Sequence, residues 1–170
     1  APYINEADKR YRGVVRLGVA TDTLDRTGEI VAEAPVPPFT EADLDRVVGS
    51  LLGEIRQVPP MFSAIKKAGV PMYRLARDGV TQELAPRPVT IHSLSLTRID
   101  GERLDIEVHC SKGTYVRSLA RDIGVALGTV ARLESLVRTA FGGFSLEGAL
   151  ALEALREHGL EALQGPSWVV

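Results

Sequence analysis

Apolar and polar residues alternate along several stretches of this chain, which is the pattern of β-strands with one buried face. Residues 11–20 form the first stretch, and one of its faces is apolar: Tyr11, Val15, Leu17 and Val19. Residues 89–99 form the second stretch, which is rich in β-branched side chains. The alternation there slips between Ile91 and Leu94, and this slip predicts a β-bulge.

The clearest strand pattern covers residues 104–110. Its even-numbered residues are apolar, whereas Asp105, Glu107 and His109 are polar and face the other side of the sheet. Alternate side chains on a strand lie about 7 Å apart, too far for three ligands that each need a bond of about 2 Å to one metal ion. We therefore interpret this face as solvated. Asp100-Gly101 predicts a two-residue hairpin turn before this strand.

Helices are predicted where apolar residues recur at helical spacing. Thr40 and Asp43 form a capping signature in front of an apolar series over residues 44–52. A second apolar stripe covers residues 116–127, and an Ala- and Leu-rich segment at 147–158 predicts another helix. Together these elements predict an α+β fold, with a mixed, largely antiparallel sheet and helices packed mainly on one face.

Length and composition fit a single domain. The chain has 170 residues, of which 45% are hydrophobic, and this is enough to bury one core. We assign residues 1–145 to this domain and residues 146–170 to its C-terminal helical extension. No apolar run reaches the roughly 18 residues of a membrane span. The one cysteine, Cys110, cannot form an internal disulfide, so we expect a reducing, cytoplasmic location.

The distribution of charge is more informative than its sum. A net charge of −2 is mildly unfavourable for a nucleic-acid-binding protein. Basic residues nevertheless gather in residues 9–12, 65–67 and 111–121, whereas acidic residues concentrate around 22–54 and 147–161. This separation predicts a basic face on a nearly neutral protein.

The stretch CSKGTYVRS, residues 110–118, joins a strand to a helix. Lys112, the adjacent glycine and the first amides of the helix together suit an anion, so Lys112 is a candidate substrate-binding residue. The GxxxxGK[ST] pattern of a P-loop is absent, and such a corner by itself is more often structural than a phosphate site. Arg117 and Arg121 follow one turn apart and repel each other unless an anionic group lies near them.

A long proline-rich segment, QVPPMFSAIKKAGVPMYRLARDG, occupies residues 57–79. Its three prolines and its glycines disfavour long regular elements, so we expect a structured loop that leads into a short helix near 72–78. A loop of this length inside a compact domain is usually functional.

Five motifs occur in this chain in a fixed order: KRYRGVVRLGVATDTLDRTGEI, QVPPMFSAIKKAGVPMYRLARDG, RPVTI, CSKGTYVRS and RLESLVRTAFGGF. Together they resemble the catalytic domain of the TruB-type tRNA pseudouridine-55 synthases over about residues 5–145. That family isomerises the uridine in the T-loop of tRNA without a cofactor or metal, so tRNA is the expected partner. The resemblance is specific because five separate motifs agree.

The resemblance implies a role for particular residues. The tyrosine of KxYR, here Tyr11, stacks on the flipped uracil and takes part in proton handling. The arginine of SKGTYxR, here Arg117, pairs with the nucleophilic aspartate, and Tyr115 lies close by in the pocket. The leucine of the later L-x-R motif, here Leu136, lines the base pocket. Two further substrate-binding candidates lie in the loop expected to border bound RNA: Lys66 and Tyr73.

The chemistry of a flipped base supports these roles. An enzyme that acts on a base in a folded loop must extrude it, and the extruded base needs an aromatic or apolar wall. Tyr11 and Leu136 suit such walls, although both residue types also suit ordinary packing. An arginine beside a carboxylate lowers the pKa of that carboxylate and orients it with a planar fork of donors, so Arg117 suits this task. A surface ion pair is the plainer reading of Arg117.

One part of the family pattern has no match. The nucleophilic aspartate lies in a GxxDxxAxG-like motif upstream of KxYR, and only ten residues precede Tyr11 here. Asp8, Asp22 and Asp25 stand in the wrong context to replace it. We therefore expect the nucleophile on an upstream segment of the same protein. Without that segment, we expect Arg117 to contact water or a bound anion.

Two alternatives stay open at this point. One is a non-catalytic RNA-binding module on the same scaffold. The other is a small anion-binding or nucleotide-binding domain that uses the corner at residues 110–118 alone. We interpret His92, His109 and His158 as structural, because the sequence places no partners of the right type beside them.

Overall fold

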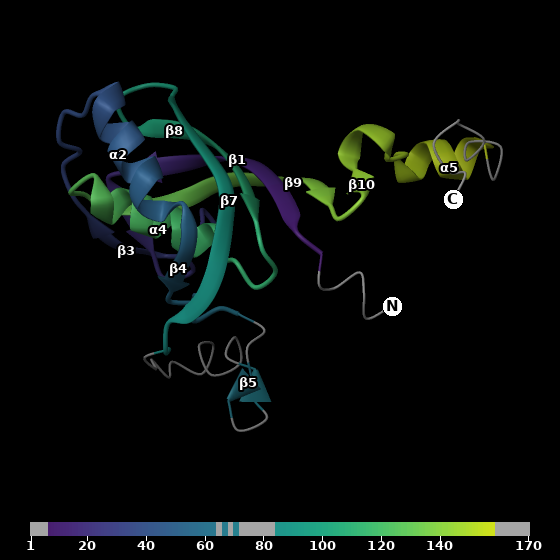
Figure 1. Cartoon of the computed structure of the whole chain (residues 1–170), viewed down its shortest axis with the longest axis horizontal. Helices are drawn as coiled ribbons and strands as arrows, with labels where there is room; N and C mark the ends of the chain where they lie inside the picture. The colour runs from purple at the N-terminus through teal and green to yellow at the C-terminus, as the bar shows by residue number, and fades with distance from the viewer. Residues whose placement is uncertain (1–6, 64–65, 68–69, 72–83, 159–170) are drawn as a thin grey trace.

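The structure is a computed structural model that describes residues 7–63, 66–67, 70–71 and 84–158. Its centre is a six-stranded sheet with the order β10-β9-β1-β8-β7-β4 (Figure 1). The strands are β1 (Lys9–Leu17), β4 (Gly53–Gln57), β7 (Arg87–Arg98), β8 (Arg103–Cys110), β9 (Ala131–Phe141) and β10 (Phe144–Ser145). All pairings between these strands are antiparallel.

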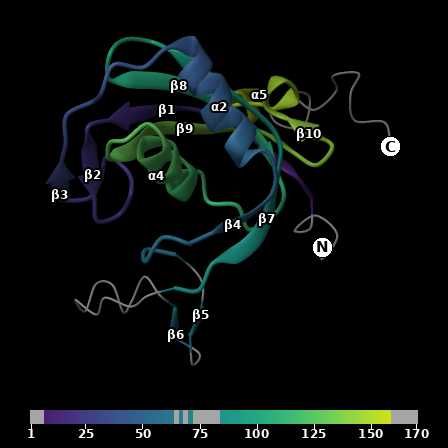
Figure 2. The same cartoon turned by 60° about the vertical axis from the view of Figure 1, so that its left-hand side comes forward.

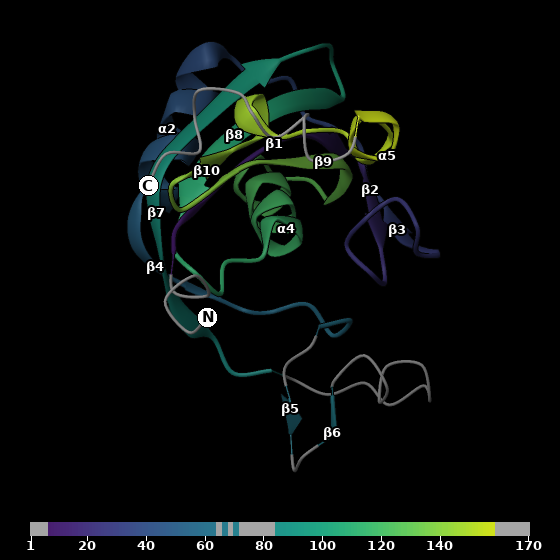
Figure 3. The same cartoon turned by 90° about the vertical axis from the view of Figure 1, so that its right-hand side faces the viewer.

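Two helices, α2 (Glu41–Leu51) and α4 (Val116–Ala126), pack against the same face of this sheet (Figure 3). Leu44 of α2 and Leu119 of α4 belong to one buried cluster together with the inward side chains of β1, β7 and β8. The predicted α+β fold with helices on one face is confirmed. None of the helices described here is long and apolar enough to cross a membrane.

The alternation predicted for residues 104–110 is confirmed in β8. Its apolar side chains are buried, and Glu107 on the other face is exposed. On this outer face, Arg12 of the neighbouring strand β1 lies 3.5 Å from Asp105 and 3.7 Å from Glu107. The outer face therefore carries loose, solvated ion pairs, which typically contribute less than about 1 kcal/mol each.

The predicted β-bulge is present in β7. The register against β8 shifts between Ile91 and Ser93, so that both His92 and Ser93 lie opposite His109. His92 and Ser93 are exposed, whereas Ile91 before them is buried. The extra residue thus re-aims one side chain onto the outer face of the sheet.

The connection between β7 and β8 is longer than predicted. It spans Ile99 to Glu102 instead of the two residues Asp100-Gly101. The cause is local, because Asp100 Oδ1 accepts hydrogen bonds from the amides of Glu102 (2.9 Å) and Arg103 (2.8 Å). A side chain that bonds amides two and three residues ahead stabilises a wider turn.

Shorter elements surround the sheet. They are the pair β2 (Val19–Thr21) and β3 (Ile30–Glu33), the pair β5 (Lys66–Lys67) and β6 (Val70–Pro71), the 3-10 helix η1 (Leu146–Gly148) and the helix α5 (Leu152–His158). The β5–β6 pair projects beyond the ends of β4 and β7 (Figure 2), whereas α5 extends away from the sheet past β10 (Figure 1). The helix predicted near 72–78 lies outside the described residues. The single helix predicted over 147–158 is wrong in extent, because η1 and α5 are two separate short helices and residues 149–151 between them are not helical.

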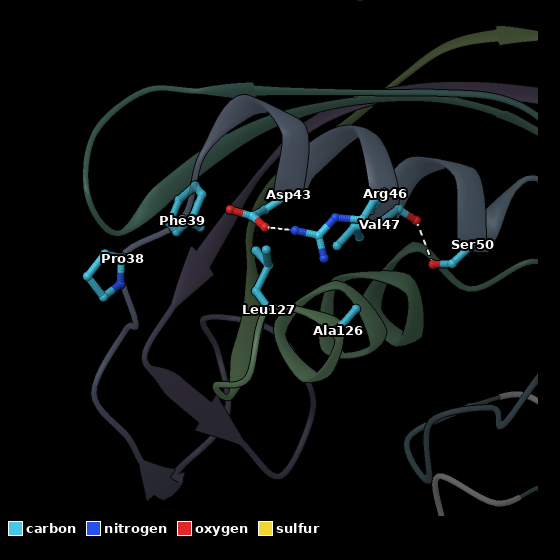
Figure 4. A pocket seen from close by; sticks show the side chains of 8 residues that line it. All are labelled: Pro38, Phe39, Asp43, Arg46, Val47, Ser50, Ala126 and Leu127. Carbon is cyan, nitrogen blue, oxygen red and sulfur yellow. Dashed lines mark hydrogen bonds and ion pairs between the residues drawn. The ribbon is translucent and has the colours of Figure 1, made fainter.

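The predicted cap of α2 is confirmed as a reciprocal capping box. The Thr40 hydroxyl accepts a hydrogen bond from the Asp43 amide at 3.3 Å, and Asp43 Oδ2 accepts one from the Thr40 amide at 2.6 Å. Figure 4 shows Asp43 paired with Arg46 one turn on, above a cavity of about 240 Å³ between α2 and the end of α4. Such a cap organises only its own helix.

Candidate active site

The helix α4 begins at the corner singled out in the sequence. Gly113 has φ 81°, in the left-handed region that favours glycine, and the Thr114 hydroxyl donates to the Ser111 carbonyl at 2.9 Å. Tyr115 is the N-cap and makes no side-chain cap. Its amide instead donates to Oε1 of Gln57 at 2.8 Å, and Gln57 is buried at the end of β4. The start of α4 is therefore capped by a side chain of the strand β4.

Side chains from the first two turns of α4 hold the beginning of the proline-rich loop. Ser118 Oγ donates to the Val58 carbonyl at 2.8 Å, and Arg121 Nη2 donates to the same oxygen at 3.3 Å. Arg117 Nη2 donates to the Phe62 carbonyl at 2.7 Å. The repulsion expected between the two arginines is offset, because each donates to a carbonyl oxygen of this loop and Arg121 also forms an ion pair with Asp122 at 2.8 Å.

The other side of the Arg117 guanidinium contacts the loop that joins β2 to β3. Its Nη1 donates to the Thr23 carbonyl at 2.9 Å and to Asp25 Oδ2 at 3.2 Å. The side chains of Arg117 and Asp25 are each only 24% exposed, so solvent screens this pair less than the pairs of the outer face. The expectation that Arg117 would contact water or an anion is wrong, because this loop brings Asp25 to it.

Asp25 is itself held by a set of hydroxyl groups. Its Oδ1 accepts hydrogen bonds from the Thr27 hydroxyl (2.6 Å), the Thr27 amide (3.0 Å) and the Thr23 hydroxyl (2.9 Å). Burial alone would raise the pKa of Asp25, but the Thr27 and Thr23 hydrogen bonds and the charge of Arg117 outweigh it and lower that pKa. Asp25 is therefore ionised and fixed in direction at neutral pH.

The loop that carries Asp25 is tightly built. Leu24 has φ 61°, a strained conformation for a side chain of this kind, and its carbonyl accepts a hydrogen bond from the Leu133 amide of β9 at 3.0 Å. A Cβ on Gly28 would lie 2.2 Å from Asp22 Oδ1 and 2.3 Å from Thr23 Oγ1. Only glycine fits there, and the loop is anchored to the sheet on the side of Arg117.

A cavity of about 470 Å³ opens beside this pair of charges. It is lined by eight residues of three segments: Asp25, Arg26, Thr27, Arg117, Leu133, Glu134, Ser135 and Leu136. Two of the predicted site residues, Arg117 and Leu136, are thus brought together. Leu136 is 41% exposed, so its side chain is accessible to a molecule in the cavity.

Tyr11 lies on the same sheet but does not line this cavity. It packs partly buried against the core, and the Arg138 guanidinium lies 5.6 Å from the centre of its ring. Gly13, two residues further on the same face of β1, is paired with Leu136 of β9. Tyr11 is therefore about 7 Å along the strand from the row that contains Leu136.

The remaining candidates occupy different positions. Tyr115 lies at the N-cap of α4, adjacent to Val116 and Arg117, and Lys112 is exposed in the turn before it. Lys66 is in β5, but its side chain lies outside the described residues, as does the whole of Tyr73.

Sequence reasoning missed two residues of the candidate site, Asp25 and Gln57. The threonines two residues before and after Asp25 are a signal for a side-chain-stabilised turn. They do not indicate the partner of that turn, which is 92 residues away.

The interpretation of the histidines also needs correction. His92 Nε2 lies 3.2 Å and His109 Nε2 lies 3.7 Å from Asp8 Oδ2, so neither ring lacks a partner.

Comparison with known proteins places this geometry in a family. Residues 1–116 match the model of the TruB family pseudouridylate synthases, N-terminal domain. The chain belongs to this family. Over 150 residues, the chain is 50% identical to tRNA pseudouridine synthase B of Aromatoleum aromaticum. This match covers 88% of the chain and 48% of that protein. Over 153 residues, it is 44% identical to the protein of the same name from Opitutus terrae. This second match covers 90% of the chain and 64% of that protein.

The chain thus spans about half to two thirds of the length of these TruB-family relatives. Two solved structures share its fold. A Cbf5-Nop10-Gar1 complex matches with a TM-score of 0.65 and 24% identity, over 94% of this chain and 38% of that one. An H/ACA RNP bound to a substrate RNA containing 2'-deoxyuridine matches with a TM-score of 0.62 and 22% identity, over 94% and 36%.

Proposed function

We propose that this chain supplies the base-binding part of a synthase that flips the T-loop uridine of tRNA and isomerises it to pseudouridine. The observation that carries the proposal is the Arg117 network: an arginine that is held by two loops and lines a cavity of about 470 Å³, whose apolar wall is formed by Leu133 and Leu136. A flipped base needs such a wall and a site sheltered from water. Membership of the TruB family supports the reaction class.

The role proposed for Arg117 is to orient a nucleophilic carboxylate. An arginine has five N–H donors, and its hydrogen bonds to the described residues use three of them. The other two suit the carboxylate of an aspartate on an upstream segment of the same protein. The positive charge lowers the pKa of that carboxylate, and the planar fork sets its direction toward the uracil ring.

Asp25 is poorly suited to be the nucleophile itself. Its Oδ1 accepts three hydrogen bonds and its Oδ2 faces Arg117, so an attack on the base would break several of these contacts. Asp25 instead fixes the arginine. Glu134, the other carboxylate that lines the cavity, forms an ion pair with Arg132 at 3.0 Å.

The alternative is a non-catalytic RNA-binding module. It is favoured by the observation that both carboxylates of the cavity are already engaged by arginines. The two functions make different demands, because binding needs only the walls and basic residues, whereas isomerisation also needs a free carboxylate.

The test is a pseudouridine assay on tRNA with two proteins. One is the 170-residue chain, and the other is the same chain fused to an upstream segment that carries a GxxDxxAxG-like motif. We expect no product from the first, T-loop pseudouridine from the second, and weak, salt-dependent tRNA binding by both. Product from the chain alone would mean that a carboxylate of this chain, such as Asp25 or Glu134, is the nucleophile. Binding without isomerisation by the completed protein would favour the module.

A further inference from the structure

Three potential metal ligands that are distant in sequence meet on the outer face of the sheet, away from the Arg117 cavity. They are Asp8, just before β1, His92 in the bulge of β7, and His109 near the end of β8. The bulge is the decisive feature, because it places both His92 and Ser93 opposite His109. In a regular strand, His92 and Ser93 would point to opposite faces.

The ligand atoms of these side chains are close together. Asp8 Oδ2 lies 3.2 Å from His92 Nε2 and 3.7 Å from His109 Nε2, and all three ligand atoms lie within 4.8 Å of one another. Ligands of a tetrahedral zinc ion with bonds of about 2.0 Å are separated by about 3.3 Å. Both distances to Asp8 Oδ2 are near this spacing. The two rings already lie side by side, with centres 4.7 Å apart.

The backbone at Asp8 and Lys9 is anchored to the chain on either side of β1, at β8 and at the end of β9. Its carbonyl accepts a hydrogen bond from the Gly142 amide at 2.9 Å, and the next residue, Lys9, pairs with Cys110 of β8 and Phe141 of β9. Asp8 is therefore held at the point where its carboxylate reaches the histidines. It is not simply an acid on a surface loop.

We propose that Asp8, His92 and His109 form a binding site for a divalent transition-metal ion of the zinc type, with water in the fourth position. Two imidazoles and one carboxylate are a ligand set that zinc uses when one coordination position remains open. A bound ion would join the start of β1 to β7 and β8. This site is independent of the uridine isomerisation proposed above.

The surroundings set the expected strength of the site. Arg10, which lies opposite His109 on β1, repels a cation. We therefore expect a moderate affinity that increases when Arg10 is removed.

The experiment is calorimetric titration of the 170-residue chain with zinc chloride at neutral pH, together with thermal unfolding. We expect one ion per chain and a rise in Tm of about 5 to 10 °C when free zinc is about 100 times Kd. His92→Ala and His109→Ala should each weaken binding by at least about tenfold, and Asp8→Asn should weaken it less. Arg10→Ala should tighten it severalfold.

Two variants serve as matched controls. Asp105→Asn removes an acid from the same outer face, where it pairs with Arg12, and should leave zinc binding unchanged. Cys110→Ala removes the buried thiol, the other strong zinc ligand near the site, and should also leave binding unchanged. The proposal is overturned if zinc produces neither heat nor a Tm shift. It is equally overturned if both histidine variants bind normally or if binding disappears with Cys110→Ala.

Discussion

The two helices on the inner face of the sheet, α2 and α4, have the same length of 11 residues but begin in different ways. The cap of α2 is local, because Thr40 and Asp43 satisfy each other three residues apart. The start of α4 is capped by Gln57, 58 residues away, and its Arg117 bonds the loop of Thr23, 94 residues away. A local cap stabilises one helix. A remote cap also positions loops, and this is how α4 builds a site.

The largest expected effect of this difference concerns Arg117. In the fusion to the upstream segment described under the proposed function, called the completed protein below, Arg117→Lys should lower turnover about 10²-fold, because a lysine cannot hold two loops and a carboxylate in one planar fork. The affinity for tRNA should change little. Single-turnover rates and filter-binding constants measure the two quantities.

Arg46→Lys on α2 is the matched control, because Arg46 pairs only with Asp43 on its own helix among the described residues. It should change neither the rate nor the affinity. If Arg117→Lys lowers tRNA affinity and turnover by the same factor, Arg117 acts in tRNA binding and does not orient the nucleophile.

The next effect concerns a glycine inside each helix. A Cβ on Gly124 of α4 would lie 2.5 Å from the Ala131 Cβ and 2.9 Å from the Ala131 amide of β9. Gly124→Ala should therefore lower the free energy of unfolding by about 1–3 kcal/mol through overpacking. Nothing lies within 4 Å of a Cβ on Gly49 of α2, so Gly49→Ala should raise the free energy of unfolding by about 0.5–1 kcal/mol. Urea unfolding measures the change in unfolding free energy of both variants. If the two changes have the same sign, the contrast between α2 and α4 is refuted.

Loss of the local cap should have a moderate effect that is confined to stability. Thr40→Ala removes the hydroxyl that accepts from the Asp43 amide, and it should lower the free energy of unfolding by about 1 kcal/mol. Turnover of the completed protein should stay unchanged, because α2 makes no hydrogen bond to the loops of the site among residues 7–63 and 84–158. A marked loss of turnover in a folded Thr40→Ala protein would show that α2 also shapes the cavity.

The smallest expected effect is a pH dependence from Asp25. Because its pKa is below the ordinary value of 3.8 in the folded state, ionised Asp25 adds stability above that value. This stability is lost as the pH falls through the lowered pKa. Asp25→Asn should therefore lower Tm at neutral pH. The difference in Tm between the wild type and this variant should become smaller in acid. A gap that widens in acid would contradict the lowered pKa.

The sequence was sufficient for several features that depend on neighbours along the chain. The strand alternation in β8, the bulge after Ile91 and the Thr40 capping box were all predicted from spacing. The hairpin turn was predicted too short, because the reach of the Asp100 side chain alters it.

Features that depend on tertiary contacts could not be predicted in the same way. No pattern in residues 21–28 shows that Asp25 meets Arg117, and none near Asp8 shows that two histidines converge on it. The resemblance identified Arg117 and Leu136, and the structure brings them to one cavity. The fold alone supplies their neighbours, because loop geometry is set by long-range hydrogen bonds.

The most direct test of the Arg117–Asp25 unit is a double-mutant cycle on the turnover of the completed protein. The four proteins are the wild type, Arg117→Lys, Asp25→Asn and the double variant. If Asp25 acts only by fixing Arg117, the double variant will be no slower than the worse single variant. If the two losses multiply, the residues act separately, and the idea that α4 organises the site through this pair is wrong.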